Sequence, residues 1–160
     1  MKKKESPRRY WLMKSEPSVF SIRHLAKKPK KTASWDGVRN YQARNHMMEM
    51  KKGDGVLFYH SSDDPVGVAG TAEVVRESYP DHTARDPKSD YFDPKATEEK
   101  PRWFMVDVKW TSTFDNLIPL DALRRNRKLA TMLILRRGNR LSVTPVTEAE
   151  WKAILAMSKR

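Results

Sequence analysis

Residues 66–75 read Val-Gly-Val-Ala-Gly-Thr-Ala-Glu-Val-Val and follow a turn signal at Asp63-Asp64-Pro65. Valine and threonine favour a β-strand, because β-branched side chains pack well on a pleated surface. Small residues interrupt the run, and inside a strand they mark bulges or the close approach of another backbone. Both features are common where a small barrel curls. The stretch therefore predicts one strand of a small barrel.

Further strand signals lie on both sides of this stretch. Short apolar runs rich in β-formers predict four more strands, at residues 10–13, 55–60, 103–110 and 141–144. Helix signals separate these strands. They are caps at Ser21 and Asn40, Pro119 opening one bent or two short helices up to Met132, and a capping box from Thr147 to Glu150. The pattern predicts the α+β class, with a small mixed β-barrel of about five to six strands and short flanking helices.

The composition fits one intracellular domain with a polyanionic partner. At 160 residues the chain can bury one core, and its 32 lysines and arginines against 20 acidic residues give a net charge of +12. The apolar runs fall far short of the roughly twenty residues that span a membrane. Cysteine is absent, which excludes disulfides, thiolate zinc sites and cysteine nucleophiles. We expect a disordered basic tail at residues 1–9, one domain at residues 10–160, and a cytoplasmic location, nucleoid-associated in a bacterium or nuclear in a eukaryote.

Residues 35–44, Trp-Asp-Gly-Val-Arg-Asn-Tyr-Gln-Ala-Arg, combine two aromatics, a turn glycine, an amide and two arginines. Asp36-Gly37 is a turn signal, and Asn40 is suited to cap a helix that runs toward Met50. A helix start offers free N–H groups to anions such as phosphate. The residues leave two interpretations open: a binding turn, or a loop whose Trp35 fills the core.

Enzyme signatures are poor. The chain has no phosphate-binding loop of the Gly-x-x-x-x-Gly-Lys type, no Gly-x-Ser-x-Gly elbow, and no pair of histidines at helical metal spacing. His60 beside Asp63 and Asp64 fits either an acid/base or metal cluster or, more simply, a polar turn at the end of a strand. We therefore predict no catalytic residue, no metal site and no cofactor.

Aromatic residues interleaved with cations give a stronger signal. Trp11, Trp35, Tyr41 and Tyr59 lie beside polar or basic residues at expected strand ends and turns, where an aromatic ring can stack on a nucleobase while arginines hold phosphates. Three other tryptophans fall within regular elements and are predicted to pack in the core: Trp103, Trp110 and Trp151. Polar residues at apparent strand or helix ends can contact the edge of a base: Lys14, Ser15, Asn40 and Ser142.

Several ordered motifs make the chain resemble the EVE domain family. They are Met-Lys-Ser-Glu-Pro at 13–17, the whole of residues 35–44, Phe-Tyr-His-Ser at 58–61, Asp-Pro-Lys-Ser at 86–89, Arg-Trp-Phe-Met-Val-Asp-Val at 102–108 and Arg-Gly-Asn-Arg-Leu-Ser-Val at 137–143. The resemblance covers nearly all of residues 10–155. It implies a PUA-like fold, similar to the YTH and ASCH domains. It also implies binding of nucleic acid that carries modified bases, with modified cytosine in DNA, such as 5-methylcytosine, as the favoured ligand.

Together, these observations predict a monomeric, non-catalytic reader of a modified base. The predicted base pocket consists of Trp11, Lys14, Ser15, Trp35, Asn40, Tyr59 and Ser142. The predicted phosphate-binding residues are Arg39, Arg44, Arg137 and Arg140. Two alternatives stay open: an RNA-binding protein of tRNA or rRNA metabolism, and an enzyme that uses the polar residues around His60. The chain departs from the family pattern at Met48, Gly55 and Asp90.

Overall fold

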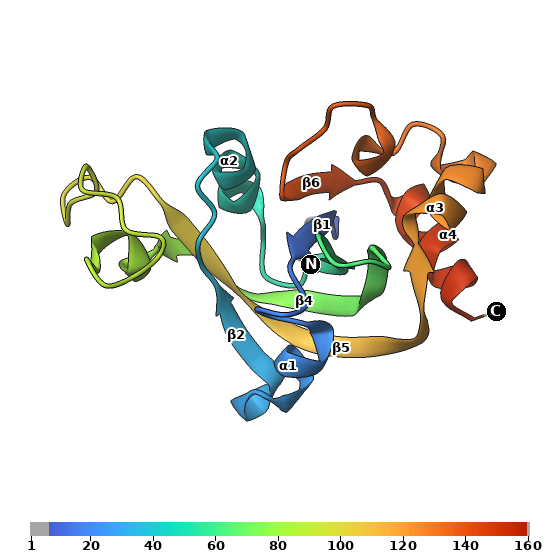
Figure 1. Cartoon of the computed structure of the whole chain (residues 1–160), viewed down its shortest axis with the longest axis horizontal. Helices are drawn as coiled ribbons and strands as arrows, with labels where there is room; N and C mark the ends of the chain where they lie inside the picture. The colour runs from blue at the N-terminus through green and yellow to red at the C-terminus, as the bar shows by residue number, and fades with distance from the viewer. Residues whose placement is uncertain (1–6, 160) are drawn as a thin grey trace, which may run out of the picture.

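The computed structural model describes residues 7–159, which form one six-stranded mixed sheet with short helices around it (Figure 1). The strand order is β2-β5-β4-β3-β1-β6, and only the β1–β3 pair is parallel. The strands are β1 (Tyr10–Ser15), β2 (Thr32–Trp35), β3 (Gly55–His60), β4 (Gly67–Pro80), β5 (Phe104–Pro119) and β6 (Val143–Val146). The predicted α+β class and strand number are confirmed, and β2 is a strand that the sequence reasoning missed.

The predicted strand at residues 66–75 is the central β4, which continues to Pro80. Its pairing with β5 shifts register at four places, and a side chain at Gly70 would meet the Ser112 carbonyl oxygen at 2.3 Å. Both expected features, bulges and close backbone approach, are therefore present. They let the two long strands bend, so that the sheet curves like a barrel. Within the described residues β2 and β6 form the two edges and do not pair with each other.

In the part of the chain that the structure describes, four α-helices flank the sheet: α1 (Ile22–Lys27), α2 (Tyr41–Glu49), α3 (Leu120–Arg125) and α4 (Glu148–Ser158). The four 3-10 turns are η1 (Pro29–Lys31), η2 (His82–Arg85), η3 (Arg127–Leu129) and η4 (Leu133–Leu135). The caps predicted at Ser21, Asn40 and Thr147 all accept the expected backbone N–H bonds. None of the described helices is both long and apolar enough to cross a membrane.

The sheet separates two hydrophobic clusters. Because side chains alternate along a strand, Trp11 and Leu12 point to opposite faces. Trp11 packs with α1 and α2, whereas Leu12 packs with α3 and α4. Trp103 and Trp151 are buried, and Trp110 is partly buried against the first cluster. All three therefore pack against the core, as predicted.

Gly55, the first residue of β3, lies opposite Tyr10 of the neighbouring strand β1. A Cβ there would lie 2.8 Å from the rings of Tyr10 and Trp151, so glycine makes room for those two rings, which pack at a tilt of 31°. Residues 1–6 of the predicted tail lie outside the described residues. At its described end, the Arg8 guanidinium donates to the Gly53 carbonyl, and the Arg9 N–H donates to Asp54.

Candidate nucleic-acid interface

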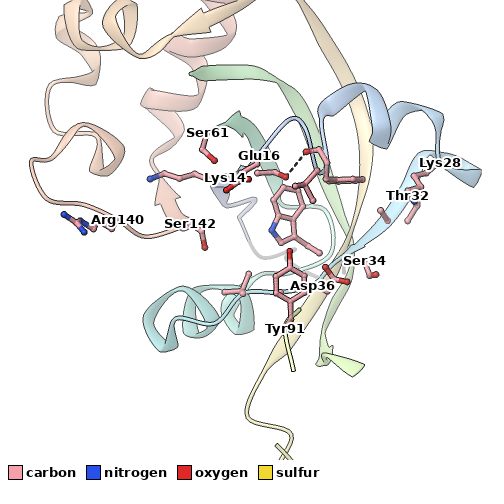
Figure 2. A pocket seen from close by; sticks show the side chains of 17 residues that line it. Lys14, Glu16, Lys28, Thr32, Ser34, Asp36, Ser61, Tyr91, Arg140 and Ser142 are labelled. Carbon is pink, nitrogen blue, oxygen red and sulfur yellow. Dashed lines mark hydrogen bonds between the residues drawn. The ribbon is translucent and has the colours of Figure 1, made fainter. Parts of the chain in front are cut away.

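A cavity of about 820 Å³ opens where β1 ends, between the loop before α1, strand β2 and the segment that leads into β6 (Figure 2). Two backbone bonds bring these parts together. Lys14 N donates to Ser142 O at 2.8 Å, and Ser61 N donates to Ser15 O at 2.9 Å. The lining residues are Lys14, Ser15, Glu16, Val19, Phe20, Lys28, residues 32–38, Ser61, Tyr91, Arg140 and Ser142. The volume falls in the range usual for small-ligand sites.

Trp35, the last residue of β2, lines the cavity and also belongs to the first hydrophobic cluster. Its side chain is only 7% exposed, and its ring lies 5.2 Å from that of Phe58 in an edge-to-face arrangement. Phe20, another lining residue, meets it edge-to-face at 6.0 Å. The two interpretations left open for Trp35 therefore describe one position, because a residue at the boundary of the core can serve as the floor of a cavity.

The turn after Trp35 is locked against the long loop of residues 81–103. Gly37 has φ of +81°, and a Cβ there would lie 2.7 Å from the Tyr91 ring, so both conformation and space require glycine. Gly37 N donates to Asp81 at 2.8 Å. The loop thus brings Tyr91 to the cavity. The sequence reasoning missed Tyr91, whose signal is an aromatic residue in a long polar loop.

Two oppositely charged side chains of the cavity are left without a partner. In the described residues neither the Lys14 ammonium nor the Asp36 carboxylate makes an ion pair or a side-chain hydrogen bond to another residue, although the Asp36 carboxylate accepts from its own backbone N–H. Partial burial lowers the pKa of Lys14. Partial burial also raises the pKa of Asp36, and the charge of Asp81 raises it further. Both charged forms are therefore destabilised relative to water, and a ligand that pairs with them would relieve this cost.

Two of the predicted aromatic walls do not line the cavity. Trp11 is fully buried in the middle of β1, where its Nε1 donates to Asp54 at 2.9 Å. Tyr59 is 4% exposed and belongs to the second cluster, on the opposite face of the sheet. The prediction that they are pocket walls is corrected, because the direction in which each strand residue points assigns both of them to the core.

The predicted polar residues before and in α2 are bound by the protein itself. Asn40 accepts the N–H of Ala43 as the helix cap and does not line the cavity. Arg39 donates to Asp81 at 3.0 Å and to the Tyr91 carbonyl at 2.9 Å. Arg44 donates to the Arg102 carbonyl at 2.8 Å.

The other two predicted phosphate-binding residues have no such partners. Arg137 and Arg140 are exposed, and within residues 7–159 neither forms an ion pair. Arg140 lines the cavity and lies on the segment that leads into β6 (Figure 2). Both guanidinium groups are therefore available to an anion, and that of Arg140 belongs to the cavity.

His60 has a structural contact. Its Nε2 accepts the Ile22 N–H at 3.1 Å, which holds the start of α1 against β3. An accepting nitrogen requires the unprotonated state, and burial lowers the pKa of His60, in agreement with this contact. Among the described residues, no three histidine, aspartate or glutamate side chains lie close enough together to hold a metal ion.

The sequence and the fold place the chain among known proteins. The EVE domain model matches residues 9–157. The chain belongs to the EVE domain family. Mouse thymocyte nuclear protein 1 is 41% identical over 167 residues, which cover 94% of this chain and 74% of that protein. Among solved structures, a hypothetical protein from Leishmania major is 53% identical with a TM-score of 0.91, and the match covers 96% of both chains.

A third relative was solved with a ligand. Human THYN1, in complex with DNA that contains 5-methylcytosine, is similar to this EVE domain with a TM-score of 0.89 and 39% identity. The match covers 95% of this chain and 98% of the human one.

Proposed function

We propose that this EVE domain binds nucleic acid, with DNA as the preferred form, and holds one modified cytosine in the cavity beside Trp35. One observation carries the proposal: the unpartnered Lys14 and Asp36 share an aromatic-lined cavity, in a chain similar to a protein solved with 5-methylcytosine-containing DNA. We further propose that the protein acts by binding alone, as one domain of residues 10–160, in the cellular compartment that holds its nucleic acid.

The lining fits the chemistry of cytosine. The rings of Phe20, Trp35 and Tyr91 offer apolar surface for a base and its methyl group. The carboxylate of Asp36 can accept a bond from the exocyclic N4 amine, and the ammonium of Lys14 can donate to the N3 or O2 acceptor. Taking a base out of a duplex costs a few kcal/mol, which these contacts offset. Serine hydroxyls at 15, 34 and 142 complete a polar rim.

The test compares the affinity for matched duplexes with and without 5-methylcytosine, at one fixed salt concentration. Wild type is expected to prefer the modified duplex. Trp35→Ala is expected to abolish the preference, and Lys14→Met to reduce it while keeping the volume of the side chain. Trp110→Phe is the matched control, because it changes a partly buried tryptophan that does not line the cavity and should leave the preference intact.

Equal affinity of wild type for both duplexes would refute the proposal. Matched RNA oligonucleotides are included as competitors, and displacement of the DNA by RNA at lower concentration would favour an RNA-directed role. Chemical change of the DNA during incubation with magnesium or zinc would refute binding alone.

A further inference from the structure

A second feature of the molecule is a segment of uncompensated positive charge, residues 124–140. It contains seven lysines and arginines and no acidic residue. Four lie on α3 and η3: Arg124, Arg125, Arg127 and Lys128. Three lie before β6: Arg136, Arg137 and Arg140. All seven are exposed, whereas all six ion pairs of the described residues use cations elsewhere in the chain.

The segment is held in a defined shape despite its charge. Leu129, Met132 and Ile134 are buried in the second hydrophobic cluster, so the apolar side chains anchor the segment while the cations point outward. Two asparagines fix its turns. Asn126 accepts the Lys128 N–H at 3.0 Å, and Asn139 accepts the Leu141 N–H at 2.9 Å. The cations therefore project from a folded frame, and binding a partner would cost little ordering of the backbone.

This charged segment is continuous with the cavity. Arg140 lines the cavity, and Ser142, two residues later, accepts the backbone bond of Lys14. In Figure 2, Arg140 and Ser142 lie on the side of the cavity away from Lys28 and Thr32. Arg140 therefore lies at the opening, and the chain before it leads back through η4 and η3 to α3, which lies to the right of β6 in Figure 1.

The chemistry of this surface favours a nucleic-acid backbone over a membrane. Seven exposed like charges repel one another, which destabilises the unbound protein. A polyanion that neutralises them removes this repulsion. Surface binding to a membrane also uses exposed apolar side chains. The large exposed apolar residues of the described chain are Val19, Tyr41, Met48, Tyr91 and Phe92, and all of them lie outside residues 124–140.

We propose that residues 124–140 form a phosphate-binding surface along which the nucleic acid flanking the bound base runs away from the cavity. This inference rests on the proposed function and deepens it, because it gives the direction of the bound strand and the source of most of the sequence-independent affinity. The cavity then discriminates the base, and the surface supplies binding that depends strongly on salt.

The test is a variant with four changes on α3 and η3, Arg124→Gln, Arg125→Gln, Arg127→Gln and Lys128→Gln. Within residues 7–159, none of these side chains lines the cavity or makes an ion pair. Each phosphate contact adds about 0.9 to the slope of log affinity against log salt on duplex DNA, so the variant is expected to lose about 3 to 4 from that slope. The ratio of affinities for modified and unmodified duplex is expected to stay as in wild type.

The matched control removes four positive charges that form no ion pair in the described residues, from separate places in the chain, through Arg23→Gln, Lys52→Gln, Lys95→Gln and Lys109→Gln. All four side chains are exposed and lie outside the cavity and the charged segment. The control is expected to change the slope by less than half as much as the four changes on α3 and η3. A trinucleotide that carries the modified base is expected to bind wild type and both variants alike, since it is too short to follow the surface.

An equal loss of slope in the two variants would overturn the proposal, because net charge and not this surface would then set the affinity. An unchanged slope, with lost binding to vesicles of anionic phospholipid, would overturn it in favour of a membrane. Failure of the proposed function is a separate result: wild type would show no preference for the modified duplex, whatever the two slopes were.

Discussion

Arg39 and Arg44 differ from Arg137 and Arg140 in their contacts, because only the second pair makes no side-chain hydrogen bond or ion pair within residues 7–159. Arg39 and Arg44 donate to Asp81 and to backbone carbonyls, whereas Arg137 and Arg140 are exposed without an ion pair in the described residues. Both groups were predicted to hold phosphate. The sequence therefore shows how many cations the protein carries, but the folded structure decides which of them are already paired.

The contact at Arg39 explains why this arginine is occupied. Asp81 is 1% exposed, and burial alone would raise the pKa of its carboxyl group. Hydrogen bonds from Thr83, Gly37 and Arg39 outweigh burial and lower the pKa instead. The carboxylate is therefore charged, and Arg39 is one of the donors that make its burial possible. Arg39 thereby ties the turn after Trp35 to the long loop that carries Tyr91.

The sharpest test of the comparison is Arg39→Ala. Removing the donor leaves a buried carboxylate with fewer partners, so the free energy of unfolding is expected to fall by about 2 to 3 kcal/mol. Denaturant titration measures this loss. If stability is unchanged while binding to all sequences weakens, then Arg39 belongs with the free arginines and the comparison fails.

Arg137→Ala tests the exposed arginines. It is expected to weaken binding and to leave stability nearly unchanged, the reverse of Arg39→Ala. Stability is expected to change by less than about 0.5 kcal/mol, because an exposed side chain without partners contributes little. Binding is expected to weaken for modified and unmodified duplexes alike, with a loss of about 1 from the salt slope. Titrations at several salt concentrations measure it, and a loss confined to the modified duplex would assign Arg137 to base recognition.

The smallest effect concerns His60, the last residue of β3, which contacts the start of α1. His60 accepts the Ile22 N–H, and burial followed by the charge of His24 lowers its pKa below 6.5. The folded state therefore binds its proton less readily than the unfolded state. This contribution to stability is present above pH 6.5 and is lost as the pH falls through the lowered value.

His60→Gln is expected to flatten this pH dependence, because the amide oxygen of glutamine can accept the same N–H bond at any pH. Melting temperatures at about pH 7.5 and about pH 5.5 measure the difference between variant and wild type. His24→Gln serves as a comparison at the neighbouring histidine, which accepts the Ser21 N–H at 2.9 Å. An equal pH dependence in wild type and His60→Gln would contradict the assignment.

The local features of the chain were predictable because their causes lie within a few residues. The cap at Asn40, the capping box from Thr147 to Glu150 and the buried strand β3 follow from short-range patterns, and the structure agrees with each. Strand β2 escaped the prediction because its four residues gain their strand conformation mainly by pairing with β5, far away in the chain. Strands that depend on a distant partner leave a weak local signal.

The amino-acid sequence alone determined the class of the fold, the caps, the excess of positive charge and its concentration in residues 124–140. Tertiary structure decided which tryptophan faces the cavity and which arginine is free. The bond from Arg39 to Asp81 spans 42 positions in the chain, and the ring of Tyr91 meets Gly37 across an even longer separation. Burial and pairing depend on such distant contacts, which local periodicity does not encode.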